Sequence, residues 1–195
     1  MECGTTETDL DPRVVRTRKL LHDAFRSLVH ERRMSDISVQ DITSRATLNR
    51  ATFYAHYNSK EDLAVGVLKT DLQQAICSRF QHRPPLTPEH LVEFGVAFFE
   101  FLGDIHGNCP KAGAELQDVI GGAVRETLHE LIEGWITAGG TWRKMFPGSS
   151  KTAVATVLSW SLYGAAYRWI RSKKHEPAVD VCREIVAVLM QPSTA

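Results

Sequence analysis

Long apolar runs are missing from this chain of 195 residues. No stretch reaches the roughly 18 to 20 uninterrupted apolar residues that a membrane-spanning helix needs. The first residues, MECGTTETDLDPR, are acidic and polar, and they lack the basic and apolar blocks of a signal peptide. These absences predict a soluble protein of the cytoplasm with no membrane partner.

Metal-binding and catalytic patterns are missing as well. The four cysteines lie far apart, and neither a CxxC pair nor an HExxH motif occurs. We find no nucleophile beside a base, no paired carboxylates on one apolar face and no phosphate-binding loop. The sequence therefore predicts reduced structural thiols, no bound metal, no cofactor and no enzymatic activity.

Net charge is zero, so overall charge does not indicate a nucleic-acid partner. The charge is unevenly distributed, however. Residues 1–11 carry a net charge of −4, whereas residues 12–62 carry ten Lys and Arg against six acids. A modestly basic N-terminal segment on a neutral body is typical of a DNA-binding domain, although a solvated charged surface would have the same composition.

Residues 38–63 read SVQDITSRATLNRATFYAHYNSKEDL and form the most informative stretch. Ser38, Asn49 and Ser59 each stand where a side chain can cap a following helix. Residues 47–48 form the break between the first two of these helices. A short helix, a tight turn and a second helix with polar and aromatic residues are typical of the helix-turn-helix, which reads DNA.

The flanking segments complete a small domain. Apolar residues at helical spacing predict a first helix over 14–32, with a basic edge near its start that can reach phosphate: Arg16, Arg18, Lys19 and Arg26. Met34 and Ile37 are predicted core residues beneath the helix-turn-helix. A further helix from Lys60 to about Arg79 is long enough to connect this domain to a body.

Three prolines between residues 84 and 88 make the clearest break in the chain. Beyond it we see only helical patterns, and Gly121-Gly122 is expected to interrupt or kink one of them. The expected helices of the body are 89–106, 114–120, 123–138, 151–173 and 178–190. The predicted fold is therefore all-α, with a disordered tail at 1–12, a helix-turn-helix domain at 13–62 and a helical body at 63–195.

Three runs carry a family resemblance: RTRKLLHDAF at 16–25, DIT at 41–43 and, above all, ATLNRATFYAHYNSKEDL at 46–63. With these runs the N-terminal part, about residues 14–68, resembles the tetracycline-repressor (TetR) family of bacterial transcriptional regulators. One departure is Ala51, where the family often has glycine. Alanine favours the helix by roughly 1 kcal/mol over glycine. The body matches the family only in its helical pattern.

The resemblance implies a role in DNA binding for particular positions. Asn49 and Arg50 would reach base edges from the start of the recognition helix, where Arg can bond guanine and Asn adenine. Tyr54 would bond phosphate through its hydroxyl, while Phe53 and Tyr57 belong mainly to the core. The complete expected set of DNA contacts is Ser38, Thr43, Arg45, Asn49, Arg50, Thr52, Tyr54, His56 and Lys60.

The last two helices are the predicted dimer interface, because their apolar residues exceed what one face needs and 164–166 are small. The resemblance implies a four-helix bundle with a second copy; packing within one chain is the alternative. The expected interface comprises Val157, Gly164, Ala165, Trp169, Cys182, Ile185 and Leu189.

A ligand that releases the protein from DNA is the family's usual mechanism, and its entry into the body would shift the placement of the two DNA-binding domains. Pocket walls are expected among Phe98, Phe99, Leu102, Leu128, Leu131, Trp135, Trp160 and Tyr163, which favours an apolar or aromatic effector. Plain core is the alternative for each. His90, His106 and His129 could supply polar anchors or metal contacts, although surface positions explain them equally.

A ligand-responsive repressor that binds a pseudo-palindromic operator as a dimer is therefore the expected function. Two other classes remain open. One is a helical small-molecule-binding protein or enzyme without DNA activity, and the other is an interaction module whose N-terminal domain binds a protein. Steeply salt-dependent binding to DNA distinguishes the first class from both.

Overall fold

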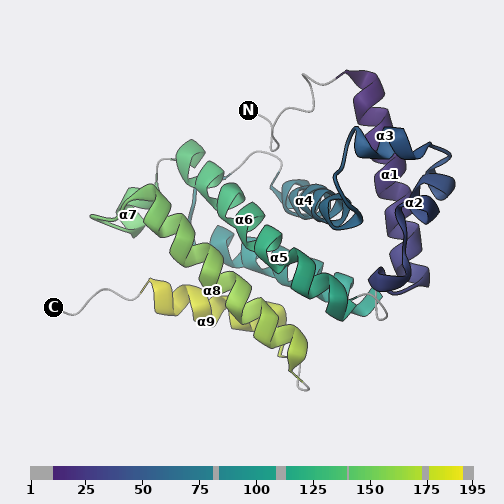
Figure 1. Ribbon diagram of the computed structural model, residues 1–195. Helices are drawn as coiled ribbons and strands as arrows, with labels where there is room; N and C mark the ends of the chain where they lie inside the picture. Colours follow the sequence, from purple (N-terminus) through teal and green to yellow (C-terminus); the bar gives the residue numbers. More distant parts are fainter. Residues whose placement is uncertain (1–10, 81–83, 109–112, 140, 173–175, 191–195) are drawn as a thin grey trace. The chain divides into compact units, whose positions relative to one another are not determined.

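A computed structural model describes residues 11–80, 84–108, 113–139, 141–172 and 176–190 (Figure 1). Within these ranges the chain forms helices and no strands, which confirms the predicted all-α class. The elements in order are α1 (Pro12–Glu31), the 3₁₀ turn η2 (Met34–Asp36), α2 (Val39–Ala46), α3 (Arg50–Tyr54), α4 (Lys60–Arg79), α5 (Pro88–Asn108), α6 (Gly113–Gly139), α7 (Trp142–Met145), α8 (Lys151–Arg171) and α9 (Ala178–Leu189).

The helices divide between two compact units. The first unit joins the chain up to Asp71 with residues 104–124, and the second joins residues 72–103 with the chain from Arg125 onward. The boundary predicted after residue 62 falls inside α4, which continues to Arg79. The domain limits 13–62 and 63–195 therefore stay a prediction, and the expected tail lies mostly outside the described residues.

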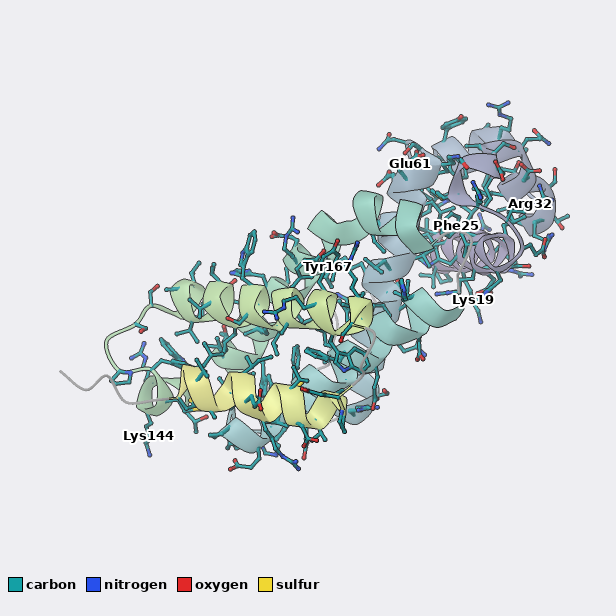
Figure 2. All side chains as sticks on the ribbon, turned by 90° about the horizontal axis from the view of Figure 1, so that it is seen from below. Lys19, Phe25, Arg32, Glu61, Lys144 and Tyr167 are labelled. Carbon is teal, nitrogen blue, oxygen red and sulfur yellow. The ribbon has the colours of Figure 1, made fainter. Side chains whose placement is uncertain are left out.

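The first unit is built on α1. Asp11 begins this helix by accepting a hydrogen bond from the backbone N–H of Arg13 at 2.8 Å, and Pro12 occupies the first helical position, where its missing N–H costs nothing. Phe25 lies inside the unit, whereas Lys19 and Arg32 point outward (Figure 2). Met34 and Ile37 are buried as predicted.

The helix-turn-helix follows from local capping. Ser38 and Asp41 form a reciprocal capping box at the start of α2, since each side chain accepts from the other residue's backbone N–H. Thr47 takes the left-handed conformation, with φ 57°, and so ends α2. Asn49 then begins α3 by accepting from the N–H of Thr52 at 2.7 Å. The caps and the break agree with those read from the sequence.

Aromatic residues fill the second unit. The rings of Phe94 and Trp135 stack with their centroids 5.4 Å apart, and Phe80 lies against both. The Trp135 indole donates its N–H to the carbonyl of Pro84 at 2.6 Å, so the buried ring leaves no unsatisfied donor. Phe99 contacts Trp169 of α8 with centroids 5.5 Å apart. Helices α5, α6 and α8, with the residue that follows α4, thus supply the aromatic side chains of this unit.

Helix α5 packs tightly against α8 and α9 at Gly95. A Cβ atom at this position would lie 2.9 Å from Sγ of Cys182 and 3.1 Å from a methyl carbon of Leu162. Both neighbours are buried, so neither can move freely.

We expect Gly95→Ala to lower the free energy of unfolding by about 1 to 3 kcal/mol through overpacking. Denaturant titration checks this. The control is Gly107→Ala near the end of α5, because Gly107 is exposed and a Cβ there meets nothing within 4 Å, so this change should leave stability unchanged or raise it.

Two expectations for the body were wrong. Helix α6 runs unbroken from Gly113 to Gly139, through Gly121 and Gly122, where an interruption was expected. Two glycines cost roughly 2 kcal/mol in a helix, and burial of the flanking Ile120 and Val124 offsets this. Helix α7 was not predicted at all; its four residues carry the buried Trp142.

The cysteines also depart from expectation. Cys77 is disulfide-bonded, whereas all four cysteines were predicted to be reduced. Wide spacing in the sequence does not exclude proximity in a folded chain, so that inference was too strong. Cys182 is a free thiol, and burial raises its pKa to about 12, which keeps it protonated and unreactive. In the described part of the chain, the helices are too short or too polar to cross a membrane.

Candidate nucleic-acid interface

Helix α3 presents polar side chains outward from a buried aromatic anchor. Phe53 is fully buried, and its ring meets that of Tyr54 edge-on at 5.3 Å. Tyr54 itself is 50% exposed. The guanidinium of Arg50 lies 6.0 Å from the centre of the Tyr54 ring, and its Nη2 donates to the Tyr54 hydroxyl at 3.4 Å. Arg50 and Tyr54 therefore form one exposed pair on this helix.

Asn49 caps the start of α3 with its side chain. Its side-chain oxygen accepts from the backbone N–H of Thr52 and from the Thr52 hydroxyl at 2.9 Å. The carboxamide oxygen is thus occupied by the cap, and the NH₂ group is the part left to donate to a base edge. Bidentate recognition of adenine, which needs both ends of the amide, would require this cap to open.

Three of the expected DNA contacts form hydrogen bonds to other groups of the same chain. Thr43 is 1% exposed, and its hydroxyl donates to the carbonyl of Val39, so we do not keep it as a proposed contact. Arg45 donates to both carboxylate oxygens of Glu31 at 2.8 and 3.0 Å, which neutralises its charge. The Nζ of Lys60 donates to the carbonyls of Met34 and Ile37, each at 2.8 Å.

Lys60 consequently has a structural task that the sequence did not reveal. It satisfies carbonyls of the linker between α1 and α2 from the start of α4, so it ties the recognition motif to that helix. Ser38 is exposed but uses its hydroxyl in the capping box. Of the expected set, Asn49, Arg50, Thr52, Tyr54 and His56 remain on or beside the outward part of α3.

A buried polar pair supports α3 from behind. Nε2 of His22, on α1, lies 2.7 Å from the hydroxyl of Tyr57, which follows α3. The Tyr57 ring lies against Gly66 of α4, where a Cβ would come within 3.0 Å of it. Burial, assisted by the charge of Arg26, lowers the pKa of His22 to about 4. The sequence identified Tyr57 as core but not this partner, which is 35 residues away.

The outer surface of α8 carries an unusual apolar row. Val157 is 50% exposed and Trp160 is 60% exposed, and both lie in line with exposed Gly164 and Tyr167 at helical spacings of three and four residues. The guanidinium of Arg125 lies 5.0 Å from the centre of the Trp160 ring and 5.1 Å from that of Tyr163. A single chain leaves this surface open to solvent.

The expected interface residues fall into three groups. Val157 and Gly164 are exposed, and Ala165, Trp169, Ile185 and Leu189 are half-buried. Cys182 is completely buried against α5 and cannot contribute to an interface in this structure. Val188, which the sequence did not single out, is 66% exposed on α9.

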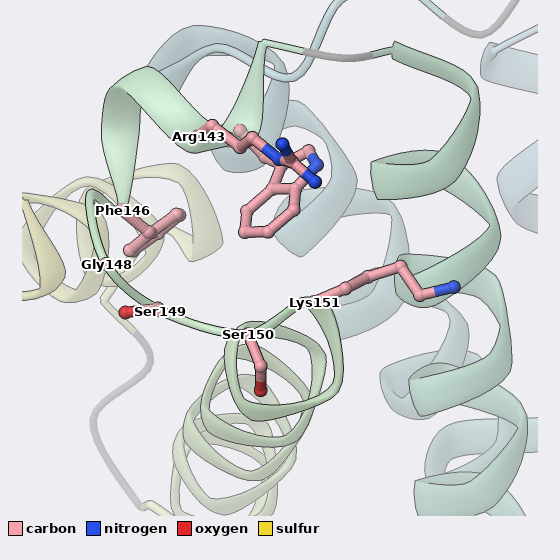
Figure 3. A pocket seen from close by; sticks show the side chains of 7 residues that line it. Arg143, Phe146, Gly148, Ser149, Ser150 and Lys151 are labelled. Atoms are coloured by element: carbon pink, nitrogen blue, oxygen red, sulfur yellow. The ribbon is translucent and has the colours of Figure 1, made fainter.

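Most expected pocket residues are packed core of the second unit. Phe98, Phe99 and Leu128 have no exposed surface, while Leu131 and Tyr163 are half-buried. Trp160 lies on the surface described above, so it is not a wall of an internal pocket here. A pocket of about 390 Å³ opens elsewhere in this unit (Figure 3), lined by Trp142, Arg143, Phe146, Gly148, Ser149, Ser150 and Lys151.

Helix order, capping and an exposed recognition helix together define a helix-turn-helix regulator. Comparisons with known proteins agree. Residues 21–67 match the family model described as bacterial regulatory proteins, tetR family. Residues 21–67 therefore form the DNA-binding domain of the TetR family of bacterial transcriptional regulators.

Named relatives cover different parts of the chain. It is 39% identical over 77 residues to the uncharacterized HTH-type transcriptional regulator YxbF of Bacillus subtilis (strain 168). The aligned segment covers 39% of this chain and 19% of YxbF. It is 29% identical to the HTH-type transcriptional repressor DhaR of Mycobacterium sp. (strain GP1), over 84% of this chain and 87% of DhaR. Both relatives are named as transcriptional regulators.

Solved structures show the same fold. The TetR family repressor AlkX from Dietzia sp. strain DQ12-45-1b superimposes with a TM-score of 0.59 at 18% identity, over 92% of this chain and 96% of AlkX. At this level of identity the likeness concerns the fold alone.

Proposed function

We propose that this regulator is a repressor that binds a pseudo-palindromic operator as a homodimer and leaves it when a small molecule binds the body. The observation that carries the DNA-binding part is the exposed Arg50–Tyr54 pair on a capped, anchored α3. The resemblance over most of its length to DhaR, a repressor by name, supports repression over activation. On this proposal the protein acts in the cytoplasm, where the DNA is, and catalyses no reaction.

Dimerisation is supported by the open apolar surface of α8 and α9. Trp160, Val157 and Val188 are each at least half exposed, and such a row is uncommon on a monomer. A second copy related by a two-fold axis would cover it and would place two recognition helices on successive half-sites. We keep Ala165, Trp169, Ile185 and Leu189 as proposed rim residues and omit Cys182.

The effector is proposed to be apolar or aromatic, because the core residues from which any pocket would open are Phe98, Phe99, Leu102, Leu128 and Trp135. In this structure they pack against one another. Ligand binding would therefore have to select a more open arrangement of the second unit, and the ligand shifts the equilibrium only by its preference for that arrangement.

Arg50 gives the sharpest test of sequence reading. Selection of binding sites from a random duplex library should yield a two-fold symmetric consensus for the wild-type protein. We expect Arg50→Ala to change that consensus and to weaken binding to the wild-type site by about 1 to 3 kcal/mol. Tyr54→Phe should instead weaken all duplexes about equally. Recovery of an unchanged consensus with Arg50→Ala would exclude a base-reading role.

The whole proposal fails if no duplex is enriched and if binding to DNA shows no salt dependence between about 50 and 200 mM, since a phosphate-binding protein loses affinity steeply over that range. A helical binding protein or a protein-interaction module would give that result.

A further inference from the structure

The pocket beside the start of α8 differs in composition from the core of the second unit. Its volume is about 390 Å³, and its walls come from α7, from the loop after α7 and from the first residue of α8 (Figure 3). A pocket of this size holds a small organic molecule. Two aromatic side chains and two cations line it, and the described lining residues include no Asp or Glu. The pocket therefore combines apolar walls with positive charge.

Trp142 and Phe146 supply the apolar walls. Trp142 is 8% exposed, so its indole is fixed by packing, whereas Phe146 is half-buried. The loop between α7 and α8 turns at Gly148, which has a φ of 77°, and a Cβ there would meet nothing within 4 Å. The pocket is thus open on the side of this glycine. Two rings beside an open space favour a flat, apolar ligand body that packs against them.

Lys151, one of the two cations, is already engaged with α6. Its Nζ lies 3.6 Å from Oε1 of Glu133 and donates to the Thr137 hydroxyl at 3.2 Å. The hydroxyl of Ser150 is engaged as well, because it caps α8 by accepting from the backbone N–H of Ala153 at 3.2 Å. Neither group is therefore the main polar anchor for a ligand.

Arg143 is the cation that remains available. Its guanidinium lies 5.3 Å from the centre of the Trp142 ring, and the residue is exposed. Within the part of the chain that the structure describes, Arg143 forms no ion pair. A guanidinium beside an aromatic ring keeps its N–H donors, which bind a carboxylate through two parallel hydrogen bonds. Arg143 thus places an anion-binding group next to the aromatic walls.

We propose that this pocket binds an aromatic monocarboxylate, a flat ring that carries a single carboxylate group. The ring would lie against Phe146 and Trp142, and the carboxylate would accept two hydrogen bonds from Arg143. One available cation matches one negative charge, so a monoanion fits better than a dianion or a neutral compound. None of the lining residues belongs to the core from which the effector pocket is proposed to open. The site is therefore a second one, and it does not rest on the proposed function.

Cinnamate is the probe, and cinnamyl alcohol is its neutral counterpart of similar shape. Isothermal titration calorimetry of the full chain, without DNA, should show one cinnamate bound per chain. Cinnamyl alcohol should bind at least about tenfold more weakly, because it lacks the charged hydrogen bonds. Equal affinities for the two compounds, or no binding of cinnamate up to about 5 mM, would overturn the inference. Since DNA is absent, failure of the proposed function would leave this result unchanged.

Arg143→Gln assigns the binding to this pocket. We expect it to weaken cinnamate at least about tenfold and to leave cinnamyl alcohol unaffected. Lys144→Gln is the matched control, since Lys144 is the next residue of α7, is exposed and has the same charge but does not line the pocket. Equal losses in the two variants would show that net charge, not a contact, is responsible. That result, or unchanged affinity in Arg143→Gln, would contradict the proposed site.

Phe146→Ala tests the aromatic wall separately. Both compounds lose the same ring contact in this variant, so both should bind more weakly while the ratio of their affinities stays as in wild type. Arg143→Gln should instead bring that ratio close to one. Because Arg143 is exposed and without an acidic partner in the described chain, its variant should melt at about the wild-type temperature. A Phe146→Ala protein with wild-type affinity for both compounds would rule out ring packing in this pocket.

Discussion

Trp160→Glu is expected to convert the protein from a dimer to a monomer and to lower operator affinity at least about 100-fold. Trp160 is 60% exposed in the single chain, so the substitution removes nothing from the core of the second unit. In the proposed dimer the same ring is covered by a second copy, so a carboxylate there would be taken out of water at a cost that pairing with the neighbouring Arg125 only partly offsets. Two copies of the charge would also face each other across a two-fold axis.

The loss of DNA affinity follows from linkage of the two DNA-binding units. In a dimer the second unit binds its half-site as an intramolecular event, which contributes roughly 10² to 10⁴ to the overall affinity. A monomer loses that factor although its recognition helix is unchanged. Size-exclusion chromatography with light scattering measures the mass, and anisotropy with the selected duplex measures the affinity.

Lys144→Gln provides the control, because Lys144 is exposed on α7 and its loss changes net charge by the same amount as Trp160→Glu. It should leave both mass and affinity unchanged. A Trp160→Glu protein that remains dimeric and binds normally would show that the open row on α8 is not the interface.

Local signals explain why so much of the DNA-binding unit could be predicted from the sequence. Ser38 and Asn49 cap their helices through residues three positions away, and Thr47 ends α2 by its own backbone conformation. Such interactions can be predicted from a sequence because both partners lie within one helical turn of each other.

Contacts between distant residues could not be predicted in the same way. Lys60 reaches the carbonyl of Met34 across 26 residues, and Arg45 reaches Glu31 across 14. Both were expected to contribute to DNA binding, Lys60 at a phosphate and Arg45 through its charge, and only the folded unit shows that both side chains bond to groups within it. Helix α6 is a second example. It is continuous because burial of the residues on either side of Gly121 and Gly122 outweighs the local cost of these two glycines.

Acid is expected to destabilise the DNA-binding unit through His22. The imidazole is 8% exposed and paired with the Tyr57 hydroxyl, and its pKa in the folded protein is lowered to about 4. In the unfolded chain the group takes up a proton near its ordinary pKa of 6.5. Between these values the unfolded state binds more protons, so stability is complete above about pH 6.5 and is lost as the pH falls toward 4.

The size of this loss is about 2 to 3 kcal/mol when the pH reaches the folded pKa of His22. Hydrogen exchange of peptides from α1 and α3 measures it, because it reports on this unit separately from the aromatic core of the second. His22→Gln is the control, since glutamine can still bond the Tyr57 hydroxyl but cannot titrate. Between pH 6.5 and 4, the stability that exchange reports for His22→Gln should fall by less than that of wild type, and the difference should be about 2 to 3 kcal/mol. Equal sensitivity in both proteins would mean that carboxylates such as Asp71, which pairs with Arg26, govern the acid response instead.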